Sequence, residues 1–98
     1  MSELAKAKLI FLTKYLVEEW NQSAKDRFIK KLTNKINQIS KYPDSCPKSE
    51  YFPNLFKCVV TKQTSFYYRI LWDEKEIEII TIFDSRQDPL KEKTEPIV

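Results

Sequence analysis

Arginine, lysine, tyrosine and carboxylate side chains must supply any chemistry that this chain performs. The chain contains no histidine, which excludes an imidazole general base and the Ser-His-Asp and Cys-His catalytic sets. It also contains no glycine, which excludes a glycine-rich loop that cradles phosphate groups. Cys46 and Cys58 are too few and too widely spaced for a zinc motif, so we expect two reduced thiols, no metal site and no cofactor.

Two arginines are the main candidates for contact with a partner. Arg86 follows the last predicted strand, and an arginine fork matches the geometry of phosphate and carboxylate groups. Arg69 lies inside a predicted strand, where a structural role is as well supported: it could pair with Glu78 on the neighbouring strand, a contact worth about 0.2 to 1 kcal/mol. Lys57 and Lys62 are expected to be solvated.

The charge of the chain is unevenly distributed. The net charge is +3 over 98 residues, but residues 1–62 carry 12 Lys and Arg against 6 Asp and Glu, whereas residues 63–98 carry 5 against 8. A basic surface favours nucleic acid or an acidic protein segment as a partner, although a solvated helix exterior explains any single lysine equally well.

With 42% hydrophobic and 32% charged residues, the chain can build one modest core and is too charged to be embedded in a membrane. The amino terminus does not resemble a signal peptide, so we expect a cytoplasmic protein with no membrane partner.

An amphipathic pattern predicts a first helix from Ser2 to Trp20. Its apolar residues recur at three- and four-residue steps and form one stripe: Ala5, Leu9, Leu12 and Leu16. Phe11, Tyr15 and Trp20 widen the apolar surface beyond this stripe. We therefore expect this helix to be covered on more than one side, with the three aromatic residues in the core.

Ser23 and Asp26 are spaced as in a helix-capping motif, which predicts that a second helix starts at Ser23. Tyr42-Pro43 ends this helix, because proline disfavours helical geometry in the residue before it. Its apolar stripe has a spacing of four, four and three residues: Phe28, Leu32, Ile36 and Ile39. The lysines left to face water or a partner are Lys25, Lys30, Lys31 and Lys35. The short connection between the helices predicts an antiparallel hairpin.

Three consecutive antiparallel strands are predicted in the second half of the chain, at Leu55–Thr61, Thr64–Trp72 and Ile77–Phe83. The preceding segment, Asp44–Asn54, is predicted to be an irregular surface loop that makes contacts. The fold class is therefore α+β: one domain over residues 1–98, with an antiparallel helical hairpin packed on a three-stranded β-meander and a flexible tail at residues 90–98.

Two further expectations concern the sheet. Without glycine, the hairpin connections should be loose loops rather than two-residue turns that need positive φ angles. Tyr67 and Tyr68 point to opposite faces of their strand, so at most one lies on the core face and the other is free to be exposed.

Three segments of the sequence carry a family resemblance: LIFLTKYLVEEW at Leu9–Trp20, YYRI at Tyr67–Ile70 and IEIITIFDSRQDP at Ile77–Pro89. Together they resemble the first helix, a central strand and the closing segment of the RelE/ParE superfamily of bacterial toxins from type II toxin-antitoxin modules. The resemblance covers nearly the whole chain. It implies a cognate antitoxin protein, whose flexible segment wraps the toxin.

Family members usually begin with an edge strand before the first helix, whereas helical sequence here follows almost directly after Met1. Two alternatives are open: the true start lies upstream of Met1, or this chain lacks that strand. The loss of such a strand would expose the edge of the sheet. The consequence would be poor solubility, a homodimer when the antitoxin is absent, or dependence on a partner.

The resemblance implies two alternative mechanisms. A ParE-like toxin inhibits DNA gyrase by binding, and the residues that would contact the target are Arg86, Gln87, Arg69 and Tyr68. A RelE-like toxin cleaves messenger RNA on the ribosome, and the cations available for this are Lys57, Lys62, Arg69 and Arg86, with Tyr67 or Tyr68 for stacking on a base.

The closing segment favours the gyrase mechanism over the nuclease. It lacks the histidine or tyrosine that often follows the last strand in the nucleases, and Asp84 and Asp88 on either side of Arg86 would repel phosphates. A third alternative is an inactive module that keeps the toxin fold only for interaction.

Overall fold

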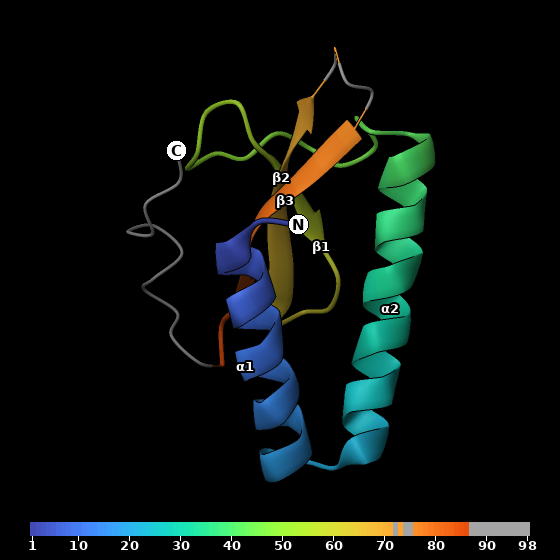
Figure 1. The fold of residues 1–98 in the computed structure, drawn as a ribbon, viewed down its shortest axis with the longest axis vertical. Helices are drawn as coiled ribbons and strands as arrows, with labels where there is room; N and C mark the ends of the chain where they lie inside the picture. Colours follow the sequence, from blue (N-terminus) through green and yellow to red (C-terminus); the bar gives the residue numbers. More distant parts are fainter. Residues whose placement is uncertain (72, 74–75, 87–98) are drawn as a thin grey trace.

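The computed structural model describes residues 1–71, 73 and 76–86, which form two helices followed by three strands (Figure 1). The elements are α1 (Glu3–Glu19), α2 (Gln22–Lys41), β1 (Phe56–Val59), β2 (Thr64–Leu71) and β3 (Glu76–Asp84). The strands form one antiparallel sheet in the order β1-β2-β3. The predicted α+β fold, a helical hairpin followed by a three-stranded meander, is confirmed. The tail predicted at residues 90–98 lies outside the described residues.

Ser2 fastens the start of α1 to the sheet. Its Oγ accepts a hydrogen bond from the backbone N–H of Ala5 (3.1 Å) and so caps the helix. The same hydroxyl donates to the carbonyl of Ile80 (2.6 Å), and the backbone N–H of Ser2 donates to the carbonyl of Ile79 (2.8 Å). The predicted start of the helix is confirmed, and its first turn is attached directly to β3.

Both β3 and α2 pack against α1, but the prediction that its three aromatic residues lie in the core is wrong for Phe11 and Trp20. Its buried residues lie on one narrow face: Ala5, Leu12 and Leu16. Phe11 is 68% exposed and Trp20 is 62% exposed, while Tyr15 is half-buried. The sheet lies behind α1 and α2 lies beside it, and no other described element covers its outer side (Figure 1).

Asn21, rather than Ser23, caps α2. The Asn21 Oδ1 accepts a hydrogen bond from the backbone N–H of Ala24 (2.8 Å), so the helix begins at Gln22, one residue before the predicted start. Asparagine and serine are equally good caps, and the local sequence therefore did not distinguish them. The predicted stripe is confirmed, with Phe28, Leu32 and Ile39 buried and Ile36 packed against them. Neither α1 nor α2, the helices of the described part, is long and apolar enough to cross a membrane.

A β-bulge in β3 helps to place apolar side chains on both faces of the sheet. Tyr67 pairs with Thr81 and Tyr68 pairs with Ile79, so Ile80 has no partner on β2. The face toward the helices contributes to the main core: Cys58, Phe66, Tyr68, Ile79 and Ile82. The opposite face carries a smaller buried cluster: Leu55, Tyr67, Ile80 and Phe83.

As predicted, only one of Tyr67 and Tyr68 lies on the face toward the main core, but the expectation that the other is free to be exposed is wrong, because both are fully buried. They do belong to opposite faces, but the segment before β1 folds back over the second face. The ring of Phe52 packs edge-on against Tyr67 with 5.1 Å between ring centroids. Asn54 closes this segment with a φ of 72°, a left-handed conformation that asparagine tolerates.

The loop between β1 and β2 has the loose form that the absence of glycine predicts. Four residues, 60–63, connect the strands. The Thr61 Oγ1 accepts hydrogen bonds from the backbone N–H groups of Gln63 (3.2 Å) and Thr64 (3.1 Å). A threonine side chain therefore organises this loop without any residue at positive φ.

We expect Ser2→Ala to lower the free energy of unfolding by about 2 kcal/mol, because it removes a helix cap worth about 1 kcal/mol and also leaves the Ile80 carbonyl without its donor. Asn21→Ala is the matched control, since it removes a cap that has no bond to the sheet, and should cost about 1 kcal/mol. Urea unfolding followed by circular dichroism measures both losses. Equal losses would show that the bond to Ile80 adds nothing.

Candidate functional site

The carboxylate of Asp84 holds Arg86 in one conformation. The Arg86 Nε donates to Asp84 Oδ1 (3.0 Å) and its Nη2 donates to Oδ2 (2.7 Å), which makes a bidentate pair. The backbone N–H of Arg86 also donates to Oδ1 (2.9 Å), a local bond by which aspartates stabilise turns. This pair uses two of the five N–H donors of the guanidinium, so three are left over.

The pairing of β2 with β3 buries Asp84. Its register partner is Thr64, whose Oγ1 donates to Asp84 Oδ2 (2.5 Å), and only 1% of the Asp84 side chain is exposed. Burial pushes the pKa of Asp84 upward, but hydrogen bonds from Arg86 and Thr64 and the charge of Arg86 outweigh burial and hold the pKa below its usual value of 3.8. Asp84 is therefore ionised at neutral pH, and its charge is directed at Arg86.

Two further contacts support the turn that carries Arg86. The Arg86 Cζ lies 5.8 Å from the ring centroid of Tyr15 on α1, within the range of a cation–π contact. The backbone N–H of Ser85 donates to the carbonyl of Gln63 (2.8 Å) in the β1–β2 loop. Arg86 is thus anchored to a helix, a strand and a loop, with one quarter of its side chain exposed.

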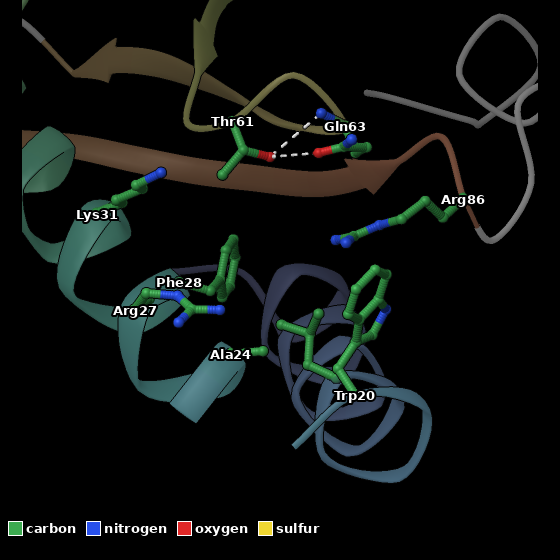
Figure 2. A pocket seen from close by; sticks show the side chains of 9 residues that line it. Trp20, Ala24, Arg27, Phe28, Lys31, Thr61, Gln63 and Arg86 are labelled. Atoms are coloured by element: carbon green, nitrogen blue, oxygen red, sulfur yellow. Dashed lines mark hydrogen bonds between the residues drawn. The ribbon is translucent and has the colours of Figure 1, made fainter. Parts of the chain in front are cut away.

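A pocket of about 310 Å³ opens beside Arg86, between the helical hairpin and the β1–β2 loop (Figure 2). It is lined by Leu16, Trp20, Ala24, Arg27, Phe28, Lys31, Thr61, Gln63 and Arg86. Figure 2 shows the guanidinium of Arg86 and the indole of Trp20 on one side of the hollow, with Arg27 across from them on α2. The pocket therefore combines an apolar wall with cationic side chains from two elements.

The structure does not bring the four cations of the nuclease alternative together. Arg69 pairs with Glu78 through Nη2 and Oε1 (2.6 Å), as the cross-strand alternative predicted. It lies five residues along β2 from the end that carries Arg86, a separation of about 17 Å. Lys57 lies on β1 with its Nζ 5.9 Å from the ring of Tyr67, whereas Lys62 is exposed in the β1–β2 loop.

Tyr68 is part of the core rather than of a surface. Its hydroxyl donates to the carbonyl of Pro43 (2.6 Å), and burial raises its pKa.

The neighbouring thiols of Cys46 and Cys58 are free and buried, and burial together with a hydrogen bond to Cys46 raises the pKa of Cys58 to about 12. Within residues 1–71, 73 and 76–86, no three side chains of histidine, cysteine or acidic type are grouped to hold a metal ion. Gln87, the other predicted contact residue, lies outside the described residues.

Three residues that line the pocket were not expected from the sequence. The sequence pattern predicts Trp20 in the core, and it indicates no role for Arg27 or for Lys31 beyond solvation or a general contact. The available signal was the four-residue spacing of Arg27 and Lys31, which puts both on one face of a helix. Nothing local shows that this face meets Gln63 and Arg86, because that contact depends on how the hairpin packs on the sheet.

The stability contributed by the Asp84 pair should depend on pH. Because the pKa of Asp84 is lower in the folded chain than its usual value of 3.8, this contribution is complete above about pH 3.8 and is lost as the pH falls through the folded value. Asp84→Asn should therefore lower the free energy of unfolding by about 1–3 kcal/mol at pH 7, with a difference from wild type that shrinks below pH 4. Urea unfolding at pH 7, 4 and 2.5 measures this difference.

The control is Glu78→Gln, which breaks the exposed pair with Arg69 and should lower the free energy of unfolding by less than 1 kcal/mol at pH 7. A difference for Asp84→Asn that stays constant down to pH 2.5 would contradict the expectation.

Comparison with known proteins gives the same family as the three sequence segments. The family described as the ParE toxin of the type II toxin-antitoxin system parDE matches residues 1–89. No curated protein sequence matches the chain. The family match spans both helices, all three strands and the Arg86 turn. The chain belongs to the ParE family of type II toxin-antitoxin toxins, a family that implies an antitoxin partner.

Proposed function

We propose that this chain acts in the cytoplasm by binding DNA gyrase and inhibiting it, and that Arg86 is a principal contact. The observation that carries the proposal is the fixed position of Arg86. Asp84 and Tyr15 hold its guanidinium at the exit of β3, while three of its N–H donors are not used by Asp84. A side chain that is already ordered loses little conformational entropy when a partner binds, so more of the contact energy appears as affinity.

The position of Arg69, away from Arg86, argues for binding rather than for cleavage of RNA. A nuclease needs a proton acceptor within about 2.6–3.2 Å of the hydroxyl that it activates, and cations grouped around the phosphate. Arg69 is engaged with Glu78 at a distance from Arg86, and Lys57 lies over Tyr67. The carboxylate of Asp84 is committed to Arg86 and Thr64, and is a poor general base because its pKa is lowered. The described residues thus offer no specific observation in favour of the nuclease alternative.

A supercoiling assay with purified gyrase tests the proposal. Wild-type chain should inhibit supercoiling, and the double variant Asp84→Asn/Arg86→Gln should need about 30-fold more protein for half inhibition, since a central arginine contact contributes about 2 kcal/mol. Changing both residues avoids leaving a buried carboxylate without its cation. Thermal unfolding of the variant establishes that it is folded.

The matched control is Glu3→Gln/Lys6→Gln, which removes an exposed ion pair on α1 that has no proposed role in binding. Inhibition should change less than threefold in this control if Arg86 is the principal contact. Equal loss in both variants would contradict the special role of Arg86. Growth arrest with cuts in messenger RNA and intact supercoiling would replace the proposal with the nuclease mechanism, and induction without any growth defect would indicate an inactive module.

A further inference from the structure

The two cysteines of the chain, Cys46 and Cys58, belong to the same hydrophobic core. Cys58 lies on β1 and is fully buried, whereas Cys46 lies in the segment between α2 and β1 and is 8% exposed. A hydrogen bond joins the two thiols. A single buried cysteine acts as a small apolar residue, but two thiols in contact can also react with each other.

The segment before β1 runs antiparallel to β1, and two backbone hydrogen bonds join them: Ser49 N–H to the Leu55 carbonyl (2.8 Å) and Lys57 N–H to the Pro47 carbonyl (2.9 Å). The antiparallel bridge between Lys48 and Phe56 lies between these two bonds. Each step back along the segment is matched by one step forward along β1. The pair that follows Pro47 and Lys57 is therefore Cys46 opposite Cys58.

This pairing has the geometry that a disulfide needs. Hydrogen-bonded and non-hydrogen-bonded positions alternate along antiparallel strands, and Lys48 with Phe56 is a non-hydrogen-bonded position because the two bonds flank it. Two residues further, Cys46 and Cys58 occupy the next such position, where opposed Cα atoms are about 4.5 Å apart. A disulfide requires a Cα separation of about 4.4–6.8 Å. The bond can thus form without a large movement of the backbone.

The segment that carries Cys46 is held to α2 and to the sheet. The hydroxyl of Ser45 accepts a hydrogen bond from the side-chain amide of Gln38 on α2 (3.1 Å). The hydroxyl of Tyr68 on β2 donates to the carbonyl of Pro43 (2.6 Å). These bonds fix the position of Cys46 relative to β1, so each thiol meets the other at a high effective concentration.

We propose that Cys46 and Cys58 form a reversible disulfide within the folded chain when hydrogen peroxide oxidises it. Peroxide first takes two electrons from the Cys46 sulfur, which becomes a sulfenic acid, and one water is released. The Cys58 sulfur then attacks the Cys46 sulfur. The S–S bond forms, the S–O bond breaks, and the departing hydroxide leaves with the Cys58 proton as a second water. In sum, two thiols and one peroxide give one disulfide and two waters.

Burial sets the order of the two steps. Cys46 is the thiol with some exposure to solvent, whereas Cys58 is enclosed, and its raised pKa of about 12 keeps it protonated at neutral pH. The disulfide would close a loop over residues 46–58 and tie the segment after α2 to β1. It would stabilise the folded chain by restricting the unfolded one. Thiol reductants would cleave it again, as expected for a disulfide that is transient in a reducing cytoplasm.

Treating the folded full-length chain with hydrogen peroxide tests the proposal. The intact mass should fall by two hydrogen atoms, and peptide mapping should find Cys46 linked to Cys58. The midpoint of thermal unfolding should rise by about 10–20 °C, which is the effect of closing a loop of this length in a domain of this size. Dithiothreitol should reverse both changes.

Two matched variants test the order of reaction. Cys58→Ala should leave a sulfenic acid on Cys46 that dimedone traps, because the second thiol is absent. Cys46→Ala should leave the enclosed Cys58 unmodified under the same conditions. Trapping of dimedone at Cys58 would contradict the order. Thermal unfolding shows whether each variant is folded, and the wild-type measurements do not depend on either variant.

Several outcomes would overturn the proposal. A disulfide that forms only in urea would show that the folded chain does not hold the thiols in a reactive position. A disulfide between two chains, or oxidation of Cys46 to a sulfinic acid without a cross-link, would show that Cys58 does not react with it. Thiols that both stay free in excess peroxide would identify a pair that only fills the core. A cross-link that leaves the unfolding midpoint unchanged or lowers it would refute the stabilising effect.

Discussion

The ion pair between the buried carboxylate of Asp84 and the guanidinium of Arg86 is the interaction on which the candidate site depends. An ionised side chain in a low-dielectric environment costs several kcal/mol unless cations and hydrogen-bond donors surround it. Here Thr64 supplies one donor from the paired strand, and Arg86 supplies two side-chain donors and its backbone N–H. The register between β2 and β3 therefore decides where the carboxylate lies, and the carboxylate decides where the arginine points. A one-residue slip of this register would move Asp84 to the other face of the sheet.

Most of the fold could be predicted because its signals are local. Apolar spacing gave both helices, and runs of β-branched and aromatic residues gave the three strands within one or two residues at most ends. The pairing of Arg69 with Glu78 could also be predicted, because an antiparallel meander with short loops restricts which residues face each other. The absence of glycine predicted the loose β1–β2 loop for the same reason: a turn is made by the residues within it.

The parts that could not be predicted depend on tertiary packing. Trp20 and Phe11 are of residue types that usually lie in a core. Their exposure follows only from the narrow contact of α1 with the sheet. Tyr67 is buried because Phe52, fifteen residues earlier, folds over a sheet face that the sequence pattern left open. The sequence analysis identified Arg86 but interpreted Asp84 as a repulsive charge near the site. In the structure the same carboxylate is paired with Arg86 and withdrawn from solvent, so the charge of Arg86 offsets its repulsion of an anionic partner.

The fixed position of Arg86 constrains any partner that fills the pocket beside it. Arg86 is too firmly held to move away when the pocket is filled, because its release would leave Asp84 charged, buried and short of donors. A segment that binds between Trp20 and Arg27 must therefore lie against the guanidinium in its present position. Acceptor groups of such a segment would meet the N–H groups that Asp84 does not use, without a change in the position of Arg86. The pair with Asp84 thus gives this side of the pocket a constant shape, whichever partner contacts it.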